Sequence, residues 1–211
     1  MILVLLGAPG AGKGTLAEYL KDVLKVPVIS TGNLLRDAIA QGTELGTAAK
    51  QYMDKGQLVP DELIVGITLQ KLSSDDCSSG AILDGFPRTV AQAEALDAHL
   101  KVDMALSIEV PDEQIVSRMA GRRTCPKCQS TYHVVNNPPK QEGVCDNCGT
   151  ELETRRDDAT EVVRKRLSVY HSQTEPVKQY YAQQGKLVSM DGVGSVAETQ
   201  HRGLQALEAW L

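Results

Sequence analysis

Seven residues near the N-terminus, PGAGKGT at positions 9–15, combine three glycines with one lysine. They follow the apolar run Ile2 to Leu6 and lead into a segment with helical spacing, Thr15 to Leu24. Glycines between a strand and a helix let backbone N–H groups converge on phosphate oxygens, and the helix start adds its positive end. The pattern therefore predicts a phosphate-binding loop (P-loop) in which the Lys13 ammonium reaches the outer phosphates.

The residue after Lys13 departs from the usual pattern, because Gly14 stands there and Thr15 follows it. A hydroxyl directly after the lysine normally ligates magnesium. We therefore expect Mg²⁺ to be held mainly by phosphates and water. Asp84, at the end of an apolar run, is placed to orient that water shell; the alternative is a turn residue before Gly85.

Four cysteines form two CxxC pairs that are separated by 16 residues. This spacing is typical of a zinc ribbon, in which two turns present four thiolates to one tetrahedral ion. Four thiolates close the coordination sphere, so we expect a structural site, with iron as an alternative metal and disulfides as the disfavoured alternative in a reducing compartment. The predicted ligands are Cys125, Cys128, Cys145 and Cys148. Cys77 has no partner and is interpreted as an incidental thiol.

Positive charge is concentrated in one part of an acidic chain. The net charge is -5, yet seven of the ten arginines lie between Arg118 and Arg166. The acidic balance argues against bulk nucleic-acid binding. The arginine cluster favours a polyanionic ligand, while a solvated helix face remains the alternative.

The length of 211 residues predicts one main domain with room for insertions. No apolar run approaches the roughly 18 residues of a membrane span, and no signal peptide is recognised at Met1. We therefore expect a cytoplasmic protein without a membrane partner.

Apolar runs alternate with helical patterns, which predicts an α/β fold with a doubly wound, five-stranded parallel sheet. The expected strands are Ile2–Leu6, Val26–Ile29, Ala81–Leu83, Ala105–Val110 and Leu187–Met190. The expected helices are Thr15–Leu24, Leu34–Ala40, Gly46–Asp54, Asp61–Leu72, Thr89–Leu100, Asp112–Ala120, Thr160–Gln183 and Ser195–Leu211. Two segments interrupt this rhythm, a helical insertion at 30–59 and a turn-rich β lid with the cysteines at 122–158. The core domain then comprises 1–29, 60–121 and 159–211.

Four separated motifs together resemble the adenylate kinase family, in its long form with a zinc-bearing lid. They are GAPGAGKGT at 7–15, TGNLLR at 31–36, DGFPRT at 84–89 and the arginines between 118 and 166. The resemblance implies reversible phosphoryl transfer from Mg²⁺-ATP to AMP, giving two ADP, by a monomer whose 30–59 insertion binds the nucleoside monophosphate. A kinase of the same fold acting on UMP or CMP is the near alternative. An ATPase carrying a zinc-ribbon binding module is the distant one.

The resemblance also implies residue roles. For ATP these fall on Gly10, Ala11, Gly12, Lys13, Gly14, Thr15, Arg118, Arg122, Thr131, Tyr132 and Gly194. For AMP they fall on Thr31, Arg36, Gln57, Leu58, Val59, Gly85, Arg88, Gln92, Arg155 and Arg166. The catalytic set is Lys13, Arg36, Arg88, Arg122, Arg155 and Arg166.

Residue chemistry supports several of these roles. Guanidinium groups offer bidentate donors to phosphate oxygens, which suits Arg36 and Arg88 as a clamp. Gln92 can offer a donor and an acceptor to an adenine edge, although T-x-x-Q from Thr89 also predicts a helix capping box. A movable lid would exclude water from the transfer.

Overall fold

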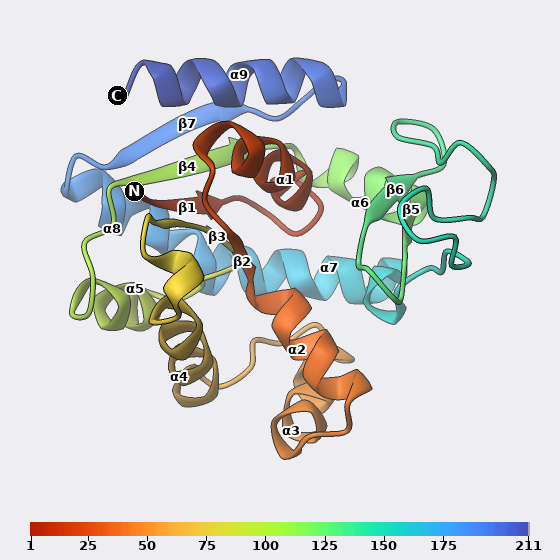
Figure 1. Cartoon of the computed structure of the whole chain (residues 1–211), viewed down its shortest axis with the longest axis horizontal. Coiled ribbons are helices and arrows are strands. Elements are labelled where there is room, and N and C mark those ends of the chain that lie inside the picture. Colours follow the sequence, from red (N-terminus) through yellow and green to blue (C-terminus); the bar gives the residue numbers. More distant parts are fainter. Residues whose placement is uncertain (211) are drawn as a thin grey trace.

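A computed structural model describes residues 1–210, so the predicted end of the last helix and of the core domain at Leu211 lies outside the described residues. Figure 1 shows a central sheet with helices packed around it. The sheet has five parallel strands in the order β2-β3-β1-β4-β7. They are β1 (Ile2–Leu6), β2 (Val28–Ser30), β3 (Ala81–Asp84), β4 (Met104–Glu109) and β7 (Leu187–Asp191). The predicted doubly wound α/β sheet is confirmed.

Both faces of the sheet are covered, which explains the continuous apolar runs in its strands. Along β1, Leu3 and Leu5 belong to one buried cluster, whereas Val4 and Leu6 belong to another. The first cluster includes side chains of α1 (Lys13–Leu24), α6 (Asp112–Gly121), α7 (Thr160–Val169) and α9 (Val196–Glu208). The second includes side chains of α4 (Asp61–Leu72), α5 (Val90–Asp97) and α8 (Pro176–Gln183).

The central strand carries the P-loop to the point where the chain order of the sheet reverses. β1 pairs with β3 on one side and with β4 on the other. In open α/β sheets, ligands bind outside the carboxyl ends of the strands at such a point. The fold therefore places residues 7–12 at the expected ligand site.

The helical insertion is a hairpin of α2 (Thr31–Ala40) and α3 (Glu44–Met53). Gly46 lets the two helices approach closely, because a Cβ there would lie 2.1 Å from the carbonyl oxygen of Ala38. Thr43 caps α3 by accepting a hydrogen bond from Gly46 N. The hairpin is thus closely packed, and residues of α2 line the edge of the cavity at the P-loop.

The lid is a small β structure, as predicted. β5 (Arg122–Thr124) pairs with β6 (Thr131–His133), and isolated bridges join Thr124 to Glu153 and Val144 to Glu151. Its buried cluster contains only Cys125, Tyr132, Cys145 and Leu152. So few buried side chains cannot hold a domain by apolar burial alone. The exact domain boundaries stay a prediction.

The single helix predicted over Thr160–Gln183 is wrong in its middle. The structure has α7, a π-helical segment η3 (Tyr170–Thr174) and α8. Pro176 has no N–H to donate to the preceding turn, and its ring conflicts with a regular α-helix there. Glu175 N donates instead to Tyr170 O at 2.8 Å, which widens the helix for one turn.

The remaining differences are small. The second strand begins at Val28 instead of Val26, and two short 3₁₀ segments, η1 (Asp75–Cys77) and η2 (Arg156–Asp158), interrupt the loops. Ser195 and Glu198 form a capping box at the start of α9. Within residues 1–210, no helix has both the length and the apolar character to span a membrane.

Candidate active site

The P-loop has a backbone that requires glycine at two places. Gly12 is the N-cap of α1 with φ of 102°, and Gly10 has φ of 86°. A Cβ on Gly10 would also lie 2.7 Å from the sulfur of Met119. The first N–H groups of a helix have no partner within the helix, so the start of α1 offers free donors beside the loop.

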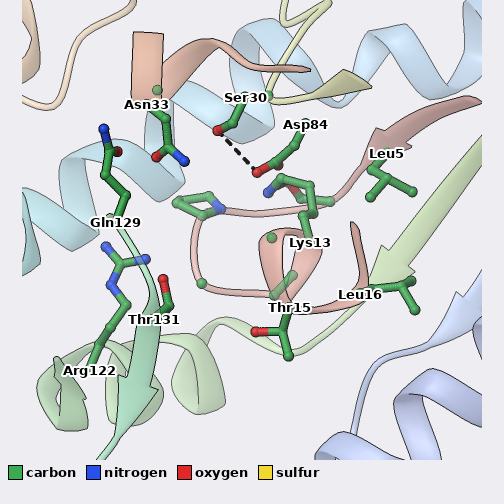
Figure 2. Close-up of a pocket in the computed structure, with 18 of the residues that line it drawn as sticks. Leu5, Lys13, Thr15, Leu16, Ser30, Asn33, Asp84, Arg122, Gln129 and Thr131 are labelled. Atoms are coloured by element: carbon green, nitrogen blue, oxygen red, sulfur yellow. Dashed lines mark hydrogen bonds between the residues drawn. The ribbon is translucent and has the colours of Figure 1, made fainter. Parts of the chain in front are cut away.

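Lys13 is the first residue of α1, and its partly buried side chain folds back against the loop. Its Nζ donates to the carbonyl oxygens of Gly7 at 2.7 Å and Ala8 at 2.8 Å. Burial lowers the pKa of Lys13 to about 8, and nearby Arg88 adds to this shift, whereas the carboxylate of Asp84 opposes it. Figure 2 shows Lys13 close to Asp84, whose Oδ2 accepts a hydrogen bond of 3.3 Å from Ser30.

One cavity of about 1040 Å³ gathers residues from the P-loop, the helical insertion, the lid and α7. The structure places every predicted nucleotide-contacting residue, and Asp84, along its wall. Its volume lies at the upper end of the range found for ligand-binding sites. Which of these side chains contact a nucleotide stays a prediction.

Two carboxylates at the end of the lid hold two of the arginines in place. Arg122 forms a two-fold ion pair with Asp158, with Nε to Oδ2 at 2.8 Å and the second bond from NH2 to Oδ1. Arg166 NH1 lies 2.7 Å from Asp157 Oδ2. The Asp158 side chain is fully buried, so its charge must be paired. Burial opposes ionisation of Asp157, yet the pKa of its carboxyl lies below its ordinary value because Arg166 and Arg122 outweigh that effect.

Two other guanidinium groups have unused donors. Among the residues that the structure describes, the Nε atoms of Arg36 and Arg155 are buried without a hydrogen-bond partner. Burial lowers the pKa of Arg155, and repulsion from Arg36 and Arg122 adds to the effect. Burial likewise lowers the pKa of Arg88, whose Nε donates to Gly85 O at 2.7 Å. Buried donors without partners are costly, so this wall is built to receive an anion.

Gln92 meets only part of the predicted capping role, and its contact with a base stays a prediction. Thr89 Oγ1 accepts a 3.1 Å hydrogen bond from Gln92 N, as a helix cap does. The Gln92 side chain, however, accepts from Arg88 N at 2.7 Å instead of returning to Thr89 N, so the reciprocal capping box is incomplete. Gln92 also lines the cavity.

Tyr132 is a wall residue with its polar end turned to the lid. Its side chain is buried in the lid cluster, and its hydroxyl accepts a 2.9 Å hydrogen bond from Asp146 N. The hydroxyl also lies 3.5 Å from Cys145 Sγ, and this hydrogen bond lowers the pKa of Cys145 to about 6. Tyr132 therefore supports the lid whatever it contributes to nucleotide binding.

Sequence reasoning missed two polar contacts around the cavity. Asn33 Oδ1 accepts a hydrogen bond from Arg36 NH2. Gln129, in the turn after Cys128, donates to Asp37 Oδ1 on α2 and so joins the lid to the helical insertion. Asn33 lay inside the TGNLLR motif, but no signal marked Gln129, because the contact joins residues that are far apart in the sequence.

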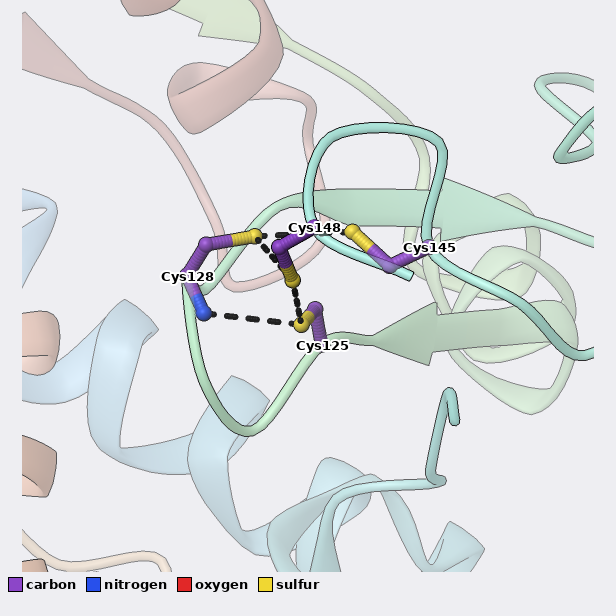
Figure 3. A group of neighbouring side chains, drawn as sticks. All are labelled: Cys125, Cys128, Cys145 and Cys148. Carbon is purple, nitrogen blue, oxygen red and sulfur yellow. Dashed lines mark hydrogen bonds between the residues drawn. The ribbon is translucent and has the colours of Figure 1, made fainter. Parts of the chain in front are cut away.

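The four predicted cysteine ligands converge from two turns of the lid (Figure 3). Their sulfur atoms all lie within 4.8 Å of one another, with Cys125 to Cys148 at 3.4 Å and Cys128 to Cys145 at 3.5 Å. A tetrahedral zinc with Zn–S bonds of 2.3 Å requires sulfurs about 3.8 Å apart. A disulfide requires about 2.05 Å. The geometry fits one shared metal ion, and all four cysteines are free in this structure.

Comparison with known proteins agrees with this geometry. Residues 5–186 match the family model described as adenylate kinase. The chain belongs to the adenylate kinase family. It is 55% identical to the adenylate kinase of Caldicellulosiruptor bescii, over 98% of this chain and 99% of the relative. Adenylate kinases of Acetivibrio thermocellus and Streptomyces griseus are 54% and 51% identical over 98% and 99% of this chain, with 98% of each relative covered.

A substitution at Asp158 tests whether its ion pair stabilises the fold of this adenylate kinase. Asp158→Asn removes a fully buried charge that pairs with Arg122, and we expect the free energy of unfolding to fall by about 3 kcal/mol. Asp191→Asn is the matched control, because the Asp191 side chain is 61% exposed and lies 3.7 Å from Arg202. We expect it to change stability by less than about 0.5 kcal/mol. Urea unfolding at neutral pH measures both, and equal effects would contradict the assignment.

Proposed function

We propose that this enzyme transfers the γ-phosphoryl group of Mg²⁺-ATP to AMP and so produces two ADP. One observation carries the proposal: Lys13 and the arginines 36, 88, 122, 155 and 166 line a single cavity. Two of those arginines carry buried Nε donors without partners within the described chain. The phosphate groups of two neighbouring nucleotides carry enough negative charge to pair with this many converging cations.

ATP would occupy the half of the cavity next to the P-loop. The loop N–H groups and the start of α1 would bind its phosphates, with Lys13 turning from the carbonyls of Gly7 and Ala8 to the outer phosphate oxygens. Arg118 is held near this end by its 2.9 Å hydrogen bond to Gly192 O. The other proposed wall residues for ATP are Thr131, Tyr132 and Gly194, together with Arg122.

AMP would occupy the half that α2 borders. Arg36 and Arg88 would bind its phosphate, and Gln92 would contact its base. Thr31 Oγ1 donates to Gly85 O at 2.8 Å, which fixes the wall between α2 and the end of β3. Residues 57–59, just after α3, would close this half, and Arg155 and Arg166 would face the junction of the two halves.

Transfer needs positioning and charge stabilisation more than acid–base chemistry. An oxygen of the AMP phosphate attacks the γ-phosphorus while the bond to the β-phosphate oxygen breaks, so no proton has to be removed from the nucleophile. Arg122, Arg155 and Arg166 would stabilise the charge spread over the equatorial oxygens of the transferring group. Asp157 and Asp158 would keep Arg122 and Arg166 in position through the ion pairs described above.

Both metals have residues that fit them. Asp84, a carboxylate beside Lys13 in the same cavity, would hold Mg²⁺ through its water shell. Magnesium neutralises phosphate charge when it is bound with ATP. Cys125, Cys128, Cys145 and Cys148 would hold a structural Zn²⁺ that takes the place of an apolar core in the lid.

The comparisons do not favour the alternatives of a UMP/CMP kinase or of an ATPase with a zinc-ribbon module, since the matched relatives carry the name adenylate kinase over nearly the whole chain. We further propose a cytoplasmic monomer without a nucleic-acid partner. Family membership supports these proposals, and the net charge of -5 supports the last of them.

The central test is a nucleotide assay. Mg²⁺-ATP is mixed with AMP, GMP, CMP or UMP, and the diphosphates and free phosphate are quantified. We expect ADP with AMP as the preferred acceptor, and a loss of roughly 10³-fold or more in Lys13→Ala. Lys165→Ala, an exposed lysine outside the cavity, is the control and should keep full activity. Free phosphate that forms without dependence on an acceptor would sink the kinase proposal.

The pKa of Lys13 predicts how ATP capture depends on pH. Burial holds this pKa at about 8 in the free enzyme, so the ammonium loses its charge as the pH rises through that value. We expect kcat/KM for ATP to fall toward a tenfold loss per pH unit above about pH 8. Bound phosphates favour the charged amine, so kcat should change less. Lys13→Arg stays charged and should lack this decline; a flat wild-type profile up to pH 10 would contradict the assignment.

Metal removal should loosen the lid before the sheet. Structural zinc contributes on the order of 10 kcal/mol to zinc-finger folding, and the lid has few other buried side chains. After chelation we expect proteolysis within 122–158 and loss of activity while the circular dichroism of the core persists. Metal analysis should find one zinc per chain, reduced in Cys148→Ser and unchanged in Cys77→Ser. Iron in place of zinc, or a lid that stays resistant to proteolysis after metal loss, would overturn this part of the proposal.

A further inference from the structure

Asp61 lies behind the proposed base-binding wall of the cavity. It is the first residue of α4, and it is not among the residues that line the cavity. Gln92, on α5, lines the cavity and is only 2% exposed. Helices α4 and α5 pack against each other (Figure 1). Asp61 therefore does not contact a ligand in the cavity directly, and it can influence such a ligand through the side chains that separate it from the cavity.

The amide of Gln92 is held at both ends by partners of opposite kind. Its Nε2 donates to Asp61 Oδ1 at 2.6 Å, and its Oε1 accepts from Arg88 N at 2.7 Å. A carboxylate only accepts hydrogen bonds, and a backbone N–H only donates them. Turning the amide by 180° would set Nε2 against the Arg88 N–H and Oε1 against the Asp61 carboxylate, so a single orientation is allowed.

The Asp61 carboxylate is itself fixed by Thr89. Thr89 Oγ1 donates to Asp61 Oδ2 at 2.9 Å and accepts from Gln92 N at 3.1 Å. The hydroxyl thus uses its proton and a lone pair in the same ring of contacts. Asp61, Thr89 and Gln92 form a closed hydrogen-bonded unit that has no freedom to adapt to a different base.

After these contacts, the Gln92 amide keeps one lone pair on Oε1 and one N–H on Nε2 for a ligand. A 6-aminopurine presents an N–H donor at position 6 beside an acceptor ring nitrogen, and it can pair with that amide. A 6-oxopurine presents an acceptor at position 6 beside an N–H donor on its Watson–Crick edge. That base would pair well only if the amide turned over.

We propose that Asp61 is the positioning residue that makes this site prefer 6-aminopurine monophosphates over 6-oxopurine monophosphates. It acts by fixing the orientation of the Gln92 amide. The inference rests on the proposed function, in which the base of the acceptor nucleotide lies against Gln92. It goes beyond that function by assigning the discrimination to a carboxylate outside the cavity.

The test compares AMP with IMP, which differs from AMP by a 6-oxo group in place of the 6-amino group. We expect the ratio of kcat/KM for AMP to that for IMP to fall about tenfold in Asp61→Ala, as expected for losing one buried hydrogen bond. Asp61→Asn keeps an acceptor oxygen and should retain most of the ratio. Glu62→Gln removes an exposed charge from the same first turn of α4 and should leave the ratio unchanged.

The ratio separates positioning from a purely structural role. If Asp61 only stabilised the start of α4, the Asp61→Ala and Asp61→Asn enzymes would lose activity toward AMP and IMP in equal proportion, and the inference would be wrong. An unchanged ratio in Asp61→Ala overturns it in the same way.

A second readout does not depend on catalysis. In ¹⁵N-labelled protein, one Nε2 proton of Gln92 should resonate far downfield because it donates to a carboxylate, and Asp61→Ala should abolish that shift. If wild-type enzyme failed to phosphorylate AMP, the proposed function would fall while this resonance still tested the orientation. A Gln92 amide signal unaffected by Asp61→Ala would contradict the positioning role alone.

Discussion

Repulsion among partly buried cations is the constraint on which this structure depends. Six guanidinium groups and the Lys13 ammonium line one cavity, and the carboxylates of Asp84, Asp157 and Asp158 balance only part of that charge. Burial lowers the pKa values of Lys13 and Arg155 because each charged form loses water and faces like charges. Such an arrangement is stable only if rigid elements hold the cations apart, and it is fully compensated only when phosphates enter. The sheet, the insertion and the lid hold the cations apart and leave a cavity that phosphates can enter.

Much of this structure could be predicted because it is determined by short stretches of the sequence. PGAGKGT after an apolar strand predicts its own backbone, since Gly10 and Gly12 must adopt positive φ and Lys13 begins the helix. The CxxC pairs likewise predict their convergence, because a metal site needs nearby thiolates. Alternating apolar runs and helical patterns predict a parallel sheet with two covered faces. In each case the physical cause acts over a few residues or through one repeated period.

The rest depends on contacts that no local pattern records. Helical periodicity continued through Thr160–Gln183, but the missing N–H of Pro176 produced a π-helical turn that periodicity does not show. Gln129 meets Asp37, and Gln92 meets Asp61, only because the fold brings distant segments together. For Gln92, a capping pattern and a base-contacting role were both compatible with the sequence. The structure shows that its backbone joins the cap while its side chain is held for another purpose.

The hydrogen bond between Gln129 and Asp37 bears on how fast products can leave. It joins the lid to α2, so a nucleotide enclosed between them in the proposed site would depart only after this latch opens. A hydrogen bond to a carboxylate contributes about 1.5–3 kcal/mol, and this one is exposed to water, so it lies at the lower end of that range and delays opening by roughly tenfold. A weak latch of neutral and acidic partners suits an enzyme whose two products are both polyanions. A latch as strong as the Arg122–Asp158 pair would trade rapid release for a trapped complex.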